Sequence, residues 1–366
     1  MMKNYFLTFL FFGLINQVFC QITLKVLDKT NSNKKIFAAG NFNNWNPADE
    51  GFSLTSINGF HFLTFYPKTK VEFKFTQGNW NTAEGDSLGN QINNRLIAEI
   101  NQKDTINLII EGWETSIPKV STMAQNVIWV ETFAKDESLE FNPEIWVYLP
   151  KSYHEKSDTY YPVIYLMDGE NLFDQTIAYS EEWGIDETLN EKELEIIVVG
   201  IGNCKSQRMD IYAPWSNSEY GGGKGVDFTK LFIYKIKPEL EKQFRIDKSR
   251  KQNFIGGSSL GALIGQYILM KYPKSFGGVI NFSPAFWFNP EIYDFTIDSE
   301  FDGLTKFYFA SGGAESEVIK SGQQKMVEIL NKKTEAIVNY KILPGESHNE
   351  SFWKKDFFTA ITWLLN

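Results

Sequence analysis

Three residue types that could form a hydrolytic catalytic triad follow one another in the order Ser, Glu, His in the C-terminal part of the sequence. The serine, Ser259, is the centre of Gly257–Gly261, a G-x-S-x-G pattern between a strand-like apolar segment and an apolar segment of helical period. A serine in this context lies on a sharp turn that exposes its hydroxyl, and the outer glycines fit because the turn packs closely against its neighbours. We therefore predict Ser259 as the nucleophile, although Gly-Ser turns also occur without catalytic function.

The general base follows almost by elimination, because the sequence contains three histidines. His61 falls in a separate N-terminal region, and His154 precedes the central strands and the serine. His348 follows the last predicted strand in the turn-rich segment Pro344–Glu350, where an imidazole can take the proton of the serine hydroxyl. We expect His348 to be the base.

A carboxylate must hold this imidazole in the correct tautomer and stabilise its protonated form. Glu315 comes after the predicted strand Lys306–Ala310 and a Gly-Gly turn, which is where the acid is expected in the order Ser, Asp/Glu, His. Glu317 and Asp302 are rival carboxylates, but both are more typical of solvated surface charges. We expect Glu315 to be the acid.

The negative charge of an acyl-transfer intermediate needs two backbone donors. One is the amide of Leu260, directly after the nucleophile. The second is expected in Leu166–Phe173, after an earlier central strand, where Gly169 lets the backbone turn its amides inward and Glu170 is the best candidate. A plain turn at Asp168–Gly169 explains the same sequence equally well.

The elements that must position these residues occupy residues 119–366. Nearly unbroken apolar runs suit strands that are buried on both faces, and helical patterns separate them. The expected strands are Asn126–Glu131, Glu144–Leu149, Tyr161–Met167, Leu194–Val199, Gly278–Asn281, Lys306–Ala310 and Val338–Leu343. Alternating strands and helices predict a mostly parallel α/β sheet covered on both sides, with ligands bound outside the carboxyl ends of its strands.

Residues 21–116 have a different pattern, with short strands between Asn/Gly turns and no helical run. The expected strands are Ile22–Val26, Lys35–Ala39, His61–Phe65, Val71–Phe75 and Ile106–Ile110. This pattern predicts a small all-β sandwich in front of the α/β domain.

Residues 1–20 are typical of an export signal, because Lys3 precedes an apolar run that is too short to span a membrane. Cleavage is expected after Cys20, and the bulky Phe19 disfavours lipidation at that cysteine. Only Cys204 then remains, which excludes an internal disulfide and a cysteine-rich metal site. The net charge of −9 argues against a nucleic-acid partner, and no later segment is apolar enough to cross a bilayer.

Five motifs of the second region together resemble the esterase D (putative esterase) family of α/β-hydrolases. They are Trp146–Pro150, Tyr161–Gly169, Val199–Asn203, Ile255–Gly261 and Gly345–His348. The family includes feruloyl and acetylxylan esterases of carbohydrate esterase family 1, enterochelin-type siderophore esterases and acyl-transfer relatives. The resemblance implies an α/β-hydrolase fold and the same roles for Ser259, His348 and Glu315, although family members often have Asp at the acid position. It also places Arg208 and Trp215 in a substrate-side loop, where a structural salt bridge and packing are equal alternatives.

Three motifs of the first region resemble the glycogen- and starch-binding modules of carbohydrate-binding family 48 and its relative, family 20. They are Ala39–Pro47, Glu72–Trp80 and Gly89–Arg95. The resemblance implies that Trp45 and Trp80 stack on sugar rings, while Lys74 and Asn94 bind hydroxyl groups. The alternative is a module that has lost sugar binding and serves only as a packing domain.

These features predict an exported serine carboxylesterase that uses a Ser-His-Glu triad and requires no metal or organic cofactor. The module that resembles glycan-binding domains favours feruloyl or acetyl esters of carbohydrates as substrates. Three alternatives remain open: a siderophore esterase, an acyltransferase, and a glycan-binding protein whose hydrolase domain is inactive.

Overall fold

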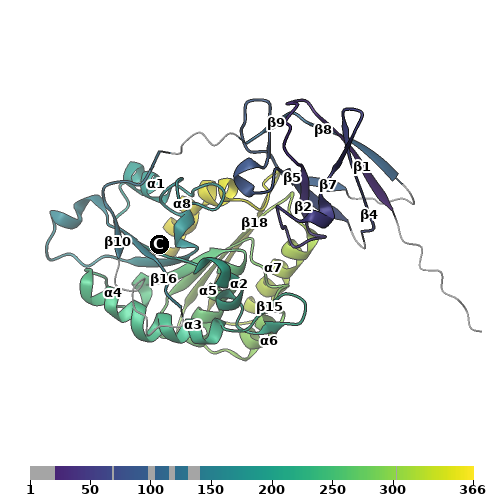
Figure 1. Ribbon diagram of the computed structural model, residues 1–366. Coiled ribbons are helices and arrows are strands. Elements are labelled where there is room, and N and C mark those ends of the chain that lie inside the picture. The colour runs from purple at the N-terminus through teal and green to yellow at the C-terminus, as the bar shows by residue number, and fades with distance from the viewer. Residues whose placement is uncertain (1–20, 68–69, 98–103, 115–119, 131–140, 302) are drawn as a thin grey trace, which may run out of the picture. The chain divides into compact units, whose positions relative to one another are not determined.

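The computed structural model (Figure 1) describes residues 21–67, 70–97, 104–114, 120–130, 141–301 and 303–366. The chain divides into two compact units, Met1–Lys119 and Val120–Asn366, and each is described by itself. The expected export signal, residues 1–20, lies outside the described residues. None of the described helices has the length and apolar character needed to cross a membrane.

Short strands form the first unit, as predicted. One sheet has the strand order β3-β4-β1-β8 and another has the order β2-β5-β7. The strands are β1 (Ile22–Asp28), β2 (Phe37–Gly40), β3 (Thr55–Ile57), β4 (Phe60–Phe65), β5 (Val71–Thr76), β6 (Glu84–Gly85), β7 (Arg95–Ile97), β8 (Asp104–Ile110) and β9 (Gly112–Trp113). Every second side chain of β1 is buried, and the apolar ones among them share one core with Phe73 and Phe75 of β5.

An eight-stranded sheet organises the second unit, with the order β10-β11-β13-β12-β16-β17-β18-β19. Its strands are β10 (Val127–Val130), β11 (Ile145–Tyr148), β12 (Val163–Met167), β13 (Ile197–Ile201), β16 (Asn253–Ser258), β17 (Gly278–Phe282), β18 (Thr305–Gly312) and β19 (Ala336–Leu343). The pairs from β13 to β19 are parallel, whereas β10 and β11 pair antiparallel at one edge. The predicted mostly parallel α/β sheet is therefore confirmed.

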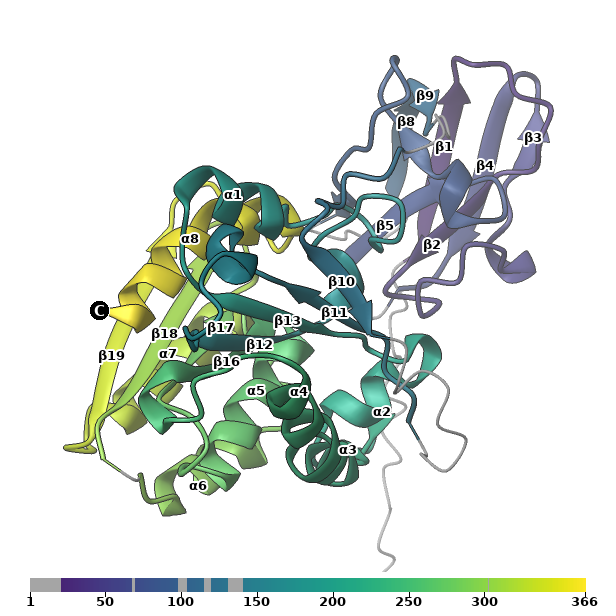
Figure 2. The same ribbon diagram turned by 90° about the vertical axis from the view of Figure 1, so that its left-hand side faces the viewer.

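Helices cover both faces of this sheet (Figures 1 and 2). They are α1 (Ile185–Lys192), α2 (Arg208–Tyr212), α3 (Gly225–Leu231), α4 (Lys237–Gln243), α5 (Leu260–Lys271), α6 (Glu291–Asp298), α7 (Glu317–Leu330) and α8 (Glu350–Leu365), and β14 (Ser216–Asn217) pairs with β15 (Gly221–Gly222) in a small hairpin. Val163 and Tyr165 of β12 join the apolar core shared with α3 to α7, and Ile164 and Leu166 join the core shared with α1 and α8. Burial on both faces explains why these strands are continuous apolar runs in the sequence.

Pro238 is the second residue of a helix that directly follows another helical segment. Helix α3 continues through a π-helical turn, Phe232–Ile236, into α4, and Pro238 lies in the first turn of α4. A proline has no amide to donate, and the π-helical turn directly before it is where the regular α-helical hydrogen bonding is interrupted.

Candidate active site

Ser259 lies at the junction between the buried strand β16 and helix α5, as the G-x-S-x-G pattern predicts. Its backbone has φ 54° and ψ −120°, a conformation that residues with a Cβ rarely adopt. Both of its backbone polar groups are held, because its amide donates to Phe282 O at 2.9 Å and its carbonyl accepts from the amide of Ala285 at 3.0 Å. Such strain persists only where the surrounding structure enforces it.

The two outer glycines of the pattern are required for space. A Cβ on Gly257 would lie 2.9 Å from the carbonyl carbon of Gly261. A Cβ on Gly261 would lie 3.0 Å from Met167 Cβ and 3.1 Å from Asp168 Oδ2. The turn is therefore packed tightly both against itself and against the end of β12.

Glu315 and His348 meet at the carboxyl ends of the strands. Glu315 follows β18 and is buried, and its Oε2 lies 3.0 Å from Nδ1 of His348, which follows β19 and is about one third exposed. Burial raises the pKa of Glu315, but hydrogen bonds and charge from His348, with further hydrogen bonds from Ser283 and Gly312, outweigh it and hold this pKa below its ordinary value. Glu315 is therefore a carboxylate that can orient the imidazole.

Two further side chains complete this site, and our sequence analysis missed both. Ser283 donates from Oγ to Glu315 Oε1 at 2.6 Å, and Trp353 of α8 donates from Nε1 to the same Ser283 Oγ at 2.9 Å. The Trp353 indole also contacts the His348 ring edge-to-face, with a centroid distance of 5.2 Å. The one available signal in the sequence was the position of Ser283 two residues after the predicted strand Gly278–Asn281.

The same segment connects the acid to the nucleophile. Phe282 accepts the amide hydrogen of Ser259, and the next residue, Ser283, binds Glu315. The three predicted triad residues thus gather at one edge of the sheet. The Ser259 hydroxyl forms no hydrogen bond to another residue that the structure describes.

The loop after β12 lies next to this turn. Asp168 has a left-handed backbone (φ 58°), and the turn Gly169–Asn171 follows it. We expected Gly169 to supply the unusual backbone conformation, but Asp168 does so. Glycine is required at 169 because a Cβ there would lie 2.4 Å from the carbonyl carbon of Gly200 in β13.

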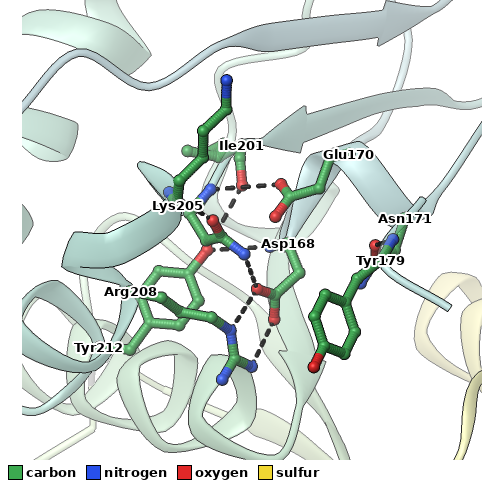
Figure 3. Close-up of polar contacts among 9 residues, drawn as sticks. Asp168, Glu170, Asn171, Tyr179, Ile201, Lys205, Arg208 and Tyr212 are labelled. Atoms are coloured by element: carbon green, nitrogen blue, oxygen red, sulfur yellow. Dashed lines mark hydrogen bonds and ion pairs between the residues drawn. The ribbon is translucent and has the colours of Figure 1, made fainter. Parts of the chain in front are cut away.

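Arg208 forms an ion pair with Asp168, which favours the structural role that the sequence left open. Its Nε and Nη2 donate to Oδ1 and Oδ2 of Asp168 at 2.6 and 2.9 Å, and Figure 3 shows the guanidinium facing the carboxylate. Asn203 adds a third donor at 2.9 Å, and the amide of Asp168 donates to the Tyr212 hydroxyl at 2.9 Å. These bonds fix the loop that carries the predicted oxyanion donor Glu170.

Glu170 itself is an unusual acid. Its Oε2 accepts from the backbone amide of Asn203 at 3.3 Å. Burial, followed by the negative charge of Asp168, raises the pKa of Glu170 to about 7, although its own amide, the Asn203 amide and Arg208 lower it in part. The Glu170 amide therefore lies beside a carboxyl group that titrates near neutral pH.

The other candidate oxyanion donor, the amide of Leu260, lies at the start of a helix. Leu260 is the first residue of α5, and its amide has no intrahelical acceptor because the first turn of a helix cannot supply one.

Glu317 is exposed and pairs with Lys320, in agreement with a surface charge. Asp302 lies outside the described residues. Trp215 packs edge-on against Tyr267 and Phe295, so its contacts are those of a packing residue.

The predicted sugar-binding residues of the first unit are brought together only in part. The Trp45 and Trp80 rings lie 6.3 Å apart at 39°, and both are half-buried. Lys74 is buried, and its Nζ lies 2.8 Å from Glu114 Oε1, so its ammonium is not available to a sugar in this arrangement. Asn94 is exposed and donates to Glu72 Oε1 at 3.0 Å.

Among the described residues, no group of three or more His, Cys, Asp or Glu side chains could hold a metal ion.

The parallel sheet with a serine on its strand-turn-helix junction defines the second unit as an α/β-hydrolase. Residues 137–364, more than half of the chain, match the family model described as "Putative esterase". The chain belongs to this esterase family, and it is a carboxylic ester hydrolase.

Three curated relatives extend this result. The chain is similar to "Uncharacterized protein YbbA" of Bacillus subtilis, with 26% identity over 239 residues that cover 61% of this chain and 92% of YbbA. It is 31% identical to "Ferri-bacillibactin esterase BesA" of the same species over 167 residues, which are 40% of this chain and 55% of BesA. A further segment of 94 residues, 25% of this chain and 7% of the other protein, is 31% identical to an "Alpha-amylase" of Niallia circulans.

Proposed function

We propose that this esterase uses Ser259 as nucleophile, His348 as general base and Glu315 as the acid that orients the base. The observation that carries the proposal is the 3.0 Å contact between Glu315 Oε2 and His348 Nδ1 beside the strained Ser259 turn. When Nδ1–H donates to the carboxylate, Nε2 is left unprotonated and can accept the serine proton.

In the reaction, Ser259 Oγ attacks the ester carbonyl and its proton passes to Nε2 of His348. The charge on the carbonyl oxygen is stabilised by the backbone amides of Leu260 and Glu170. Collapse of the intermediate breaks the ester bond, and His348 returns the proton to the leaving alcohol. Water then attacks the acyl-enzyme with the same proton transfers and releases the acid and free Ser259.

Labelling with a fluorophosphonate probe tests this assignment, because such probes react with activated serines. We expect the unaltered chain to be labelled and to hydrolyse p-nitrophenyl acetate, and Ser259→Ala to lose both properties while remaining folded. Ser258→Ala is the matched control, because Ser258 is the neighbouring serine of the same motif and is buried at the end of β16. Retained labelling in Ser259→Ala would refute the proposal.

For the substrate, we propose acyl esters linked to carbohydrates, with feruloyl or acetyl groups as the acyl part. The sequence similarity to an alpha-amylase segment supports a carbohydrate context. A siderophore ester is the second candidate, and it is favoured by the similarity to a ferri-bacillibactin esterase. Comparing hydrolysis of methyl ferulate, acetylated xylan and a catecholate siderophore separates these candidates.

We further propose glycan binding by the first unit through Trp45 and Trp80. The tilted, half-buried pair offers indole faces on which sugar rings can stack. Calorimetric titration of the full chain, carrying Ser259→Ala, with maltooligosaccharides and xylan fragments tests this idea. Trp45→Ala should abolish the heat of binding, and Trp113→Phe should retain it because Trp113 instead donates to Thr30 Oγ1 at 3.0 Å. An absence of heat with every glycan would remove this proposal.

We also propose that the protein is exported and that cleavage occurs after Cys20. The N-terminal apolar run preceded by Lys3 supports this proposal. N-terminal sequencing of protein recovered outside the cytoplasm should begin at Gln21, and a protein that retains Met1 would contradict it.

A further inference from the structure

Three large apolar side chains are exposed around the small β14–β15 hairpin. Met209 is 40%, Tyr220 44% and Trp287 42% exposed. The Tyr220 ring contacts Trp287 edge-to-face at 5.9 Å and also contacts the buried Phe288 at 5.8 Å. We call Met209, Tyr220 and Trp287 the aromatic patch. Clustered exposed apolar groups on a folded protein usually mark a binding surface.

The patch borders the candidate active site along one path through the loop that follows β17. The amide of Ala285 donates to the carbonyl of Ser259 at 3.0 Å, and the amide of Phe288 donates to Ala285 O at 3.0 Å. Trp287 is two residues beyond Ala285, so its Cα lies within roughly 14 Å of the Ser259 Cα.

A second path leads to the patch through the Asp168–Arg208 ion pair. Asp168 Oδ2 lies 3.1 Å from the position of a Cβ on Gly261, two residues after the nucleophile. Arg208 binds Asp168, and Met209 is the next residue after Arg208. The Met209 carbonyl in turn lies 3.3 Å from the position of a Cβ on Gly222 in the hairpin. Helix α2 accordingly contacts both β15 and α5.

The loop that presents Tyr220 is held in place by Asn217. Asn217 Oδ1 accepts from the amides of Glu219 and Tyr220 at 2.9 and 3.1 Å, and its Nδ2 donates to Phe288 O at 2.7 Å. These bonds join the hairpin to the loop that carries Trp287. Two exposed rings that are fixed before binding lose little conformational freedom when a ligand packs on them.

We propose that the aromatic patch binds the aromatic ring of the substrate's acyl group. This inference rests on the proposed function, because it assumes that Ser259 is acylated. A planar ring can pack against Tyr220 and Trp287 by stacking or edge-to-face contact. An acetyl group has no ring to reach the patch. The patch therefore selects aryl esters over acetyl esters.

The test compares two esters with the same alcohol, methyl ferulate and methyl acetate. In Trp287→Ala we expect kcat/KM for methyl ferulate to fall about tenfold more than kcat/KM for methyl acetate, mainly through KM. Trp287→Phe should restore most of this difference, because it retains a ring. Trp129→Ala is the matched control, since Trp129 is 46% exposed but lies on the edge strand β10. If kcat/KM in Trp287→Ala falls equally for both esters, or does not fall for either, the proposal is overturned.

Binding without turnover separates this inference from the assignment of Ser259. In the Ser259→Ala background, NMR titration with ferulic acid and with N-(2,3-dihydroxybenzoyl)serine should perturb the indole signal of Trp287, and the tighter ligand distinguishes a feruloyl from a catecholate ring. If neither ligand perturbs Trp287, the patch is not the aryl site even where Ser259 is labelled by fluorophosphonate. If Trp287 responds but Ser259 is not labelled, the aryl site stands and the proposed nucleophile fails.

Discussion

Ser283 Oγ lies 2.6 Å from Glu315 Oε1, while His348 Nδ1 lies 3.0 Å from Oε2 of the same carboxylate. The two donors approach opposite oxygens, and the amide of Gly312 adds a third hydrogen bond to Oε1 at 2.7 Å. The three hydrogen bonds therefore hold the Glu315 carboxylate in one position and favour its ionised form. We expect Ser283 to be a positioning residue, since it contacts Glu315 and Trp353, which in turn contact the proposed base His348.

Ser283→Ala removes one of these donors. A hydrogen bond to a charged group contributes about 1.5–3 kcal/mol, so we expect kcat to fall about tenfold with little change in KM. The pKa of Glu315 should rise, and the acid side of the pH–kcat profile should move to higher pH. Ser311→Ala is the control, because Ser311 is also buried and its hydroxyl has no hydrogen-bond partner in the described structure. A fall in kcat without a shift of the profile would indicate a merely structural role.

Glu315→Gln keeps the shape of the acid but removes its charge. The amide can present its NH₂ to Nδ1 and so favour the wrong imidazole tautomer, and we expect kcat to fall by about 10³–10⁴-fold, as for a comparable substitution in serine proteases. Glu317→Gln should leave the rate unchanged because Glu317 is exposed. Steady-state kinetics with p-nitrophenyl acetate measure both, and similar losses in the two variants would contradict the assignment of the acid.

Glu170 makes the stability of the protein depend on pH. Its pKa rises from 4.5 to about 7 on folding, so between these values the native state binds more protons than the unfolded state. The free energy of unfolding should therefore fall by at most about 3 kcal/mol as pH rises from about 4.5 to 7. Above pH 7 the ionisation of Glu170 should cause no further fall.

Glu170→Gln removes this titration. We expect the variant to gain stability relative to the unaltered chain at pH 8 and to gain none at pH 4.5. Urea unfolding at the two pH values measures the difference. A gain of equal size at both pH values would show that the Glu170 charge is not its cause.

The Asp168–Arg208 pair should stabilise the loop that carries the second oxyanion donor. Arg208→Met leaves the nearly buried Asp168 carboxylate without its main partner, and we expect the free energy of unfolding to fall by about 2–3 kcal/mol. This is less than for a fully buried ion pair, because Arg208 is partly exposed. The double variant Asp168→Asn, Arg208→Met should lose less free energy of unfolding than the sum of the losses in the two single variants. A double-mutant cycle by urea unfolding tests this coupling, and strict additivity would disprove it.

The mostly parallel sheet, and the placing of Ser259, Glu315 and His348 after successive strands, could be predicted because each depends on local sequence and chain order. The apolar runs indicate buried strands, and a parallel sheet brings the ends of successive strands to one edge. Ser283 and Trp353 could not be predicted in the same way. Their roles arise from the packing of α8 against the loop after β17, and no short-range pattern encodes that contact.

Glu170, Lys74 and Arg208 show a second limit of sequence reasoning. The acidity of Glu170 depends on burial beside Asp168, and the loss of Lys74 as a sugar ligand depends on Glu114, which is 40 residues away in the chain. Arg208 was equally compatible with substrate binding and with a salt bridge until Asp168 was placed against it. Long-range electrostatic partners of this kind follow from the folded arrangement rather than from sequence spacing.

The backbone of Ser259 has a consequence for folding stability. A left-handed conformation at a residue with a Cβ costs about 1–3 kcal/mol, and glycine at the same position would not carry most of that cost. If Ser259 is the nucleophile, as proposed, a change to glycine would give a chain that folds more stably but has lost the reactive hydroxyl. On that proposal, a serine at position 259 contributes to turnover and costs folding stability.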